Sequence, residues 1–106
     1  MLKNTTDATF NSDVKESSGT VVVDLWAEWC GPCKAMTPLL EAVATEMDGQ
    51  VSIYKLDIQS NPQTPGSFGV TSIPTLLIFK DGEVVDRMVG NPGSKGKIKE
   101  FIAKHA

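Results

Sequence analysis

The stretch WCGPCK, residues 29–34, decides how this chain folds, because it places a C-x-x-C pair where a strand is expected to end and a helix to begin. Residues 20–27 are almost all apolar, which is typical of a central strand covered on both faces. Apolar residues then recur at helical spacing from about Cys33 to Met47. Three-residue spacing on a helix brings side chains together, so the sulfurs of Cys30 and Cys33 can bond.

The expected position of Cys30 at a helix N-terminus indicates redox chemistry. Unpaired backbone N–H groups and the helix dipole favour negative charge at that end, and the thiolate is the nucleophilic form of cysteine. Cys33 lies one turn further in, and we expect it to stay protonated until it is needed. Gly31 lets the backbone turn tightly, and Pro32 is tolerated in the first helical turn, where its missing N–H costs little.

Two other interpretations of the cysteine pair stay open at this point. The pair could be half of a zinc site, although zinc usually takes four ligands and the chain holds only 2 cysteines and 1 histidine, His105. The two cysteines could also be inert core residues, because free cysteine packs well in protein interiors. Next to a strand–helix–strand pattern, however, a C-x-x-C pair is typical of a thiol–disulfide redox site.

Length and composition limit the class of protein. The chain has 106 residues, 41% of them hydrophobic and 22% charged, and a formal net charge of −3, which predicts one domain over residues 1–106. We find no basic field for nucleic acid and no apolar segment typical of a membrane span or a secretory signal. We therefore expect a cytoplasmic protein that binds neither nucleic acid nor membranes, and nothing in the sequence demands more than a monomer. The lack of a G-x-G-x-x-G fingerprint predicts that no dinucleotide cofactor is bound, and we expect no metal.

The remaining elements follow from periodicity and turn residues. Asn11 and Ser12 are the expected N-caps of a short first helix, and residues 51–58 are predicted to form a second central strand. Prolines and glycines in residues 61–69 allow only a short, irregular helix. Asp81-Gly82 predicts a hairpin. The hairpin strands are expected at residues 75–79 and 84–89, and a last helix at about 94–104.

This order of elements predicts an α/β fold, in which a mixed central β-sheet is flanked by helices on both faces. The segment DLWAEWCGPCK, residues 24–34, closely resembles the active-site segment of the thioredoxin family. Ile73-Pro74-Thr75, Phe79-Lys80-Asp81-Gly82 and Gly90 resemble later motifs of that family at the expected separations, so the likeness covers about residues 10–106. The resemblance therefore implies the thioredoxin fold.

The resemblance also implies the activity of a protein-disulfide reductase that maintains cellular redox homeostasis. In this activity Cys30 attacks the disulfide of a protein substrate, and Cys33 resolves the mixed disulfide that forms. A thioredoxin reductase then restores the dithiol, with electrons that come ultimately from NADPH or ferredoxin. The loop at residues 90–93 is longer than is usual in the family, which leaves the preference for partners open.

Asp24 interrupts the apolar strand on the face that it shares with Val22 and Trp26. A buried carboxyl group without a partner tends to stay protonated, so Asp24 is a candidate proton acceptor for Cys33; the alternative is an edge carboxylate in solvent. The resemblance favours the first role. It also implies that Lys55, by its pattern a solvated strand residue, lies near Asp24 and tunes it electrostatically.

The resemblance further implies a docking face for disulfide-containing proteins. The Ile73–Pro74 bond is expected to be cis and to face Cys30, so that the Ile73 backbone pairs with an extended substrate segment. Trp29 precedes the nucleophile and is expected to be half exposed. The candidate substrate-binding residues are Trp29, Gly31, Pro32, Ile73, Pro74 and Gly90.

Two rival functions stay open. One is an oxidase or isomerase of the same fold, but such relatives usually carry histidine between the cysteines, whereas Gly31-Pro32 supplies no positive charge there. The other is a regulatory subunit that docks partners in its reduced form without turnover. Serine variants of both cysteines would distinguish such a subunit from an enzyme.

Overall fold

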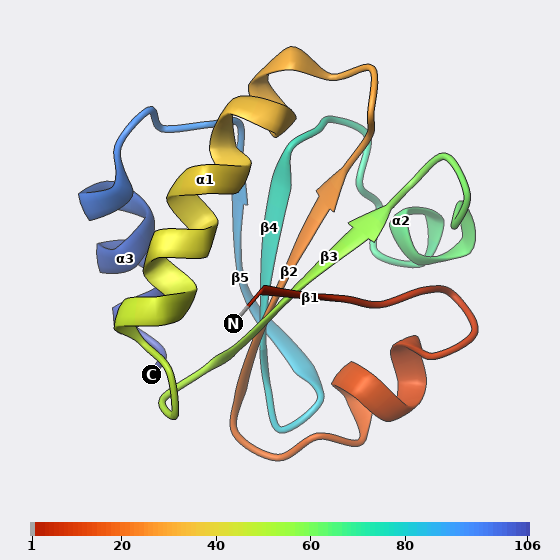
Figure 1. Cartoon of the computed structure of the whole chain (residues 1–106). Coiled ribbons are helices and arrows are strands. Elements are labelled where there is room, and N and C mark those ends of the chain that lie inside the picture. The colour runs from red at the N-terminus through yellow and green to blue at the C-terminus, as the bar shows by residue number, and fades with distance from the viewer. Residues whose placement is uncertain (1) are drawn as a thin grey trace.

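A five-stranded mixed sheet forms the centre of the protein, which a computed structural model describes over residues 2–106 (Figure 1). The strands are β1 (Leu2–Asn4), β2 (Thr20–Trp26), β3 (Ser52–Asp57), β4 (Thr75–Lys80) and β5 (Glu83–Val89). Their spatial order is β1-β3-β2-β4-β5. Strands β1, β3 and β2 are parallel, while β4 is antiparallel to both β2 and β5. The predicted mixed sheet is confirmed, and β2 lies in its middle.

Helices cover both faces of this sheet, as the sequence predicts. They are a short π-helix η1 (Asn11–Lys15) and the α-helices α1 (Gly31–Glu46), α2 (Gln63–Ser67) and α3 (Lys95–Ala103). Helices α1 and α3 lie together on one face, and α2 lies on the other (Figure 1). Among the helices of residues 2–106, none combines the length and apolarity needed to cross a membrane.

Strand β2 is apolar at most of its positions because its two faces belong to different cores. Val22 faces one core, which α1 and α3 cover, while Val21 and Val23 face the other, which contains Val14 of η1. All three of these strand valines are essentially inaccessible to solvent. Successive side chains of a strand point to opposite faces, so a strand between two helix layers needs apolar residues at every position. This arrangement makes Asp24, in the same strand, the exception that needs a chemical explanation.

The start of the first helix differs from the prediction. Asn11 and Ser12 are not N-caps, because the N-cap residue of η1 is Phe10, whose backbone is already helical and whose side chain makes no capping hydrogen bond. The Asn11 amide instead donates to Glu16, and the Ser12 hydroxyl donates to the carbonyl of Thr9. The Phe10 ring is buried in the second core, and the Phe10 backbone is already helical before the polar residues are reached.

Strand β1 was not predicted. It is three residues long and mostly exposed, and it pairs in parallel with Ile53, Tyr54 and Lys55 of β3. Main-chain hydrogen bonds form this strand, and they depend little on the side chains. The three residues Leu2–Asn4 therefore show no apolar periodicity from which a strand could be predicted. The pairing covers one edge of β3 and continues in a hydrogen bond of 2.9 Å from the Thr5 N–H to the Lys55 carbonyl.

The C-terminal end of the chain is tied to the beginning of β2. The Thr20 hydroxyl donates to the carbonyl of His105 over 2.5 Å, and the Lys80 ammonium donates to the same oxygen over 3.2 Å. The His105 ring lies 2.8 Å from a carboxylate oxygen of Asp86 in β5. These contacts lie at the end of β2 that is remote from the cysteine pair.

The predicted hairpin between β4 and β5 is confirmed, and Gly82 in its turn meets the end of η1. The Gly82 backbone has φ +86°, and a Cβ placed there would collide with the carbonyl of Lys15. Gly49 has nearly the same backbone, with φ +84°, but no neighbouring atom lies within 4 Å of an added Cβ. The two glycines therefore separate the effect of the backbone conformation from that of the close approach.

We expect Gly82→Ala to destabilise the protein more than Gly49→Ala. Gly49→Ala should lower the free energy of unfolding by about 1–2 kcal/mol, because a side chain disfavours the left-handed backbone. Gly82→Ala should lose about 1–3 kcal/mol more, because the backbone must also shift away from Lys15. Denaturant unfolding of both variants measures the difference, and equal losses would contradict the role of the close approach.

Candidate active site

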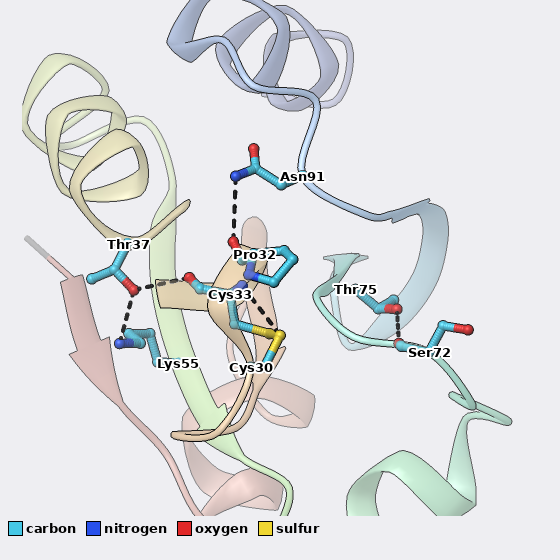
Figure 2. Close-up of a disulfide and its surroundings, with 8 residues drawn as sticks. All are labelled: Cys30, Pro32, Cys33, Thr37, Lys55, Ser72, Thr75 and Asn91. Carbon is cyan, nitrogen blue, oxygen red and sulfur yellow. Dashed lines mark hydrogen bonds between the residues drawn. A yellow bond between two sulfur atoms is a disulfide. The ribbon is translucent and has the colours of Figure 1, made fainter. Parts of the chain in front are cut away.

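Cys30 lies at the N-terminus of α1, as the sequence predicts, and is the N-cap residue of that helix. Its sulfur accepts a hydrogen bond of 3.2 Å from the backbone N–H of Cys33. The two cysteines are joined by a disulfide, with their Cα atoms 5.3 Å apart (Figure 2). The helix begins at Gly31, two residues earlier than expected, because Gly31 and Pro32 already form its first turn. An electron-poor helix end therefore faces the sulfur of Cys30 directly.

The two sulfur-bearing residues differ in their access to solvent. Cys30 is 7% exposed and Cys33 is 0% exposed. Both pack with Ala27 in a small cluster at the end of β2, and Trp26 and Ile73 cover part of this cluster. A partner that approaches from solvent therefore reaches Cys30 before Cys33.

The loop before β4 lies against the cysteine pair. The Ile73–Pro74 peptide bond is cis, as the resemblance implies, and Ile73 packs against the cysteine cluster. The Pro74 carbonyl accepts a hydrogen bond of 2.7 Å from the Gly90 N–H, which joins this loop to the end of β5. The Thr75 hydroxyl donates to the Ser72 carbonyl over 2.6 Å and closes the loop (Figure 2). The structure thus brings Ile73, Pro74 and Gly90 together beside the disulfide.

The other candidate docking residues lie at the exposed start of α1. Trp29 is 67% exposed, which is more than the expected half. Gly31 and Pro32 are also exposed, directly after Cys30. The Asn91 amide donates to the carbonyl of Pro32 over 3.3 Å, so the loop after β5 contacts the first turn of α1 (Figure 2).

Asp24 is fully buried in the middle of the sheet. It lies opposite Lys55 of β3 and Leu76 of β4, and it is 0% exposed. Neither carboxyl oxygen has a hydrogen-bond partner among the described residues. Burial raises the pKa of Asp24 from 3.8 to about 7, and the positive charge of Lys55 opposes this rise. The alternative of an edge carboxylate in solvent is therefore wrong, because β2 is a central strand.

Lys55 is half-buried, so it is only in part the solvated strand residue that its pattern indicates. Its ammonium group lies 3.9 Å from the centre of the Trp26 ring, within the range of a cation–π interaction. The ammonium also donates to the Thr37 hydroxyl over 3.2 Å, and that hydroxyl donates to the Cys33 carbonyl over 3.3 Å. Two hydrogen bonds thus connect Lys55, the neighbour of Asp24, through Thr37 to the backbone of Cys33 (Figure 2).

Sequence reasoning missed the contacts of Thr37 and Asn91. A threonine four residues after Cys33 on a helix commonly donates to that residue's carbonyl, so half of the Thr37 arrangement had a signal in the sequence. Its contact with Lys55 joins a helix to a strand 18 residues away and had none. The Asn91 contact spans 59 residues and likewise could not be predicted from local pattern.

Comparison with known proteins agrees with this geometry. The thioredoxin family model matches residues 1–104. The chain belongs to the thioredoxin family. A thioredoxin of Listeria monocytogenes is 50% identical over 105 residues, which cover 99% of both chains. One of Mycobacterium tuberculosis is 50% identical over 96 residues, covering 91% of this chain and 83% of the other, and one of Rickettsia conorii is 46% identical over 104 residues, covering 98% of both.

As a member of this family, the protein is a protein-disulfide reductase, that is, an enzyme that exchanges a dithiol for a disulfide. The redox interpretation of the Cys30–Cys33 pair is confirmed, and the interpretation as two inert core cysteines is set aside. The α/β fold that the resemblance implied is confirmed as well.

We expect Asp24→Asn to stabilise the oxidised protein in a pH-dependent way. The native carboxyl has a pKa of about 7 and the unfolded one a value near 3.8, so the unfolded chain ionises first as the pH rises. The native state therefore loses stability between these two values and no more above them. Relative to the wild type, the free energy of unfolding of Asp24→Asn should rise by about 1.4 kcal/mol for each pH unit in this range, and so by several kcal/mol above pH 7.

Denaturant unfolding at pH values from about 4 to 9 measures this difference. Asp48→Asn is the matched control, because the same change is made at an exposed side chain. A stability difference for Asp24→Asn that is independent of pH would contradict the buried, unpaired state of the Asp24 carboxyl.

Proposed function

We propose that Cys30 is the nucleophile and Cys33 the resolving cysteine of the reductase. In the first step the Cys30 thiolate attacks one sulfur of a substrate disulfide, a mixed disulfide forms, and the other substrate sulfur leaves as a thiolate that takes up a proton. In the second step the Cys33 thiolate attacks the sulfur of Cys30 and releases the second substrate thiol. The substrate gains two electrons and two protons, and Cys30–Cys33 becomes the disulfide.

The observation that carries this order of attack is the position of the two cysteines on α1. Cys30 caps the helix and is the more exposed of the two, whereas Cys33 lies one turn inside the helix and is fully buried. The helix N-terminus stabilises a thiolate at Cys30. A large substrate has access only to the outer sulfur, and the inner sulfur needs to reach no further than Cys30.

Asp24 serves in this proposal as the proton acceptor for Cys33 in the second step, and Lys55 tunes it. A group with a pKa of about 7 can take up and release a proton near neutral pH. Lys55 lies opposite Asp24 and lowers its pKa through its positive charge. Without that charge, the burial of Asp24 would shift its pKa still further from the working range.

Protein substrates are proposed to dock on the face around Cys30. Its members are the exposed Trp29, the first helical residues Gly31 and Pro32, and the joined loops with Ile73, Pro74 and Gly90. Pairing with the Ile73 backbone would read little side-chain sequence, which suits an enzyme with many disulfide substrates.

A thioredoxin reductase is the proposed partner that returns the dithiol, and the protein is proposed to act as a monomer of one domain, residues 1–106. A reducing compartment such as the cytoplasm fits this cycle, because its redox buffer keeps thiols reduced. In that setting the enzyme would help to maintain redox homeostasis. Reduction, rather than oxidation, is the proposed direction because Gly31-Pro32 puts no positive charge beside the thiolate.

An insulin-type reduction assay coupled to a thioredoxin reductase tests this proposal. Wild-type protein should turn over, whereas Cys30→Ser should be inactive and Cys33→Ser should accumulate a mixed disulfide at Cys30, detectable by mass spectrometry. A mixed disulfide that accumulates at Cys33 in the Cys30→Ser variant instead would reverse the two roles. A reduction potential near −120 mV, the oxidising end of the range of such enzymes, would indicate an oxidase.

The proposed roles of Cys30 and Asp24 can be separated by kinetics. Thiolate absorbance of the reduced protein should show one cysteine ionising well below pH 8.5, roughly the value of free cysteine. Asp24→Asn should slow the resolution of a preformed mixed disulfide and leave the first attack nearly unchanged, because only the second step needs the proton acceptor. If both steps slow equally, Asp24 has another role.

A further inference from the structure

We propose that Thr37 is a positioning residue, which holds the Lys55 ammonium group away from the carboxyl group of Asp24 and so keeps that carboxyl free to exchange a proton. The proposal rests on the function proposed above for Asp24. It assigns a role to the Thr37 hydroxyl that neither the cysteine motif nor the strand pattern of the sequence indicates.

The starting observation is an ion pair that the strand register favours but the structure does not form. Asp24 and Lys55 are direct partners on the parallel strands β2 and β3. Neighbouring strands lie about 4.8 Å apart and directly paired side chains share a face, so a lysine ammonium can reach the carboxyl opposite. Yet both carboxyl oxygens of Asp24 lack a hydrogen-bond partner among residues 2–106.

The Lys55 ammonium is held elsewhere by two contacts. It donates a hydrogen bond of 3.2 Å to the Thr37 hydroxyl of α1, and it lies 3.9 Å from the centre of the Trp26 ring. Both partners are neutral, so each is a weaker partner for an ammonium than a carboxylate at contact distance would be. Figure 2 shows the Lys55 ammonium directed at the Thr37 hydroxyl.

Thr37 can act as a fixed anchor because its hydroxyl has a defined orientation. A hydroxyl has one proton to donate and two lone pairs to accept with. The Thr37 hydroxyl donates its proton to the Cys33 carbonyl over 3.3 Å, so a lone pair is left for the Lys55 ammonium. The backbone of the resolving cysteine thereby orients the group that positions Lys55.

The surroundings of Asp24 leave Lys55 as the charged group whose position matters. Lys55 from β3 is the charge that acts on the carboxyl, and the partner from β4 is the apolar Leu76. On the face covered by α1, the buried residues are apolar apart from Cys33, which is held in the disulfide. A shallow groove of about 400 Å³, lined by Thr37, Lys55 and the acidic Glu41 among others, opens the outer side of this arrangement to solvent.

The distance of Lys55 from Asp24 has a chemical consequence. An opposite charge in direct contact lowers the pKa of a carboxyl by about 1–3 units. Direct pairing would therefore move the pKa of Asp24 well below its present value of about 7, and the carboxylate could no longer accept a proton near neutral pH. Held by Thr37, the ammonium lowers the pKa of Asp24 through space without capturing the carboxylate.

The test is the pKa of the Asp24 carboxyl, measured by ¹³C NMR titration in the oxidised protein, where Cys33 is held in the disulfide. Thr37→Val removes the hydroxyl at nearly constant shape, and Thr37→Ser retains it as the matched control. Thr37→Val should lower the pKa of Asp24 by about 1 unit, because the released ammonium pairs with the carboxylate. Thr37→Ser should keep the wild-type value, and Thr37→Ala should repeat the effect of valine if the valine variant folds poorly.

A second background shows whether the effect acts through Lys55. In Lys55→Met the pKa of Asp24 should rise, and adding Thr37→Val should then change it no further. An unchanged or raised pKa in Thr37→Val would overturn the proposal, as would an equal fall in the Lys55→Met background. This measurement needs no turnover, so it can fail while the trapping experiments succeed, and it can succeed even if Asp24→Asn leaves the resolution step unaffected.

Discussion

Backbone N–H groups at the start of α1 have no partners within the helix, and one of them, the N–H of Cys33, donates a hydrogen bond to the sulfur of Cys30. This capping contact requires β2 to end just before Cys30 and α1 to begin just after it. The central position of β2 and the two helix layers fix the approach of both elements. The loops at Pro74 and Gly90 then meet beside the capped sulfur. The position of the cysteine pair is thus set by the junction between β2 and α1.

The same central strand carries a group that the fold would be more stable without. A fully buried carboxyl costs free energy when it is ionised, and neither oxygen of Asp24 has a hydrogen-bond partner in the part of the chain that the structure describes. Burial holds its pKa near neutrality, while Lys55 limits the rise. Stability and the proposed proton transfer therefore favour different residues at position 24, and the sequence retains the acid.

Much of the fold was predictable, because its strongest elements have local signals. The apolar run of β2, the C-x-x-C pair and the Asp81-Gly82 turn each indicate their element without knowledge of distant residues. β1 could not be predicted, because main-chain pairing with β3 rather than apolar periodicity forms it. The prediction of Asn11 and Ser12 as N-caps was wrong for a similar reason. The N-cap residue is the buried Phe10, which carries no polar capping signal.

The site divides along the same line. The cysteines and Asp24 are visible in the sequence because each breaks or marks a local pattern. The exposure of Trp29, the contact of Asn91 with Pro32 and the position of the Lys55 ammonium depend on segments far apart in the chain, and only the folded protein shows them. Family resemblance supplied part of this information, for the cis bond before Pro74 and for the nearness of Lys55 to Asp24.

The fastening of His105 to Thr20 and Lys80 has a practical consequence for handling the protein. Thr20 begins the strand whose other end leads to the cysteines, and the C-terminus lies far from the start of α1 (Figure 1). A tether attached after residue 106, to a resin or an electrode, would therefore leave the disulfide turned toward the solution. Immobilised through that end, the protein would leave Cys30 accessible to large disulfide-containing substrates, with no substitution near the cysteine pair.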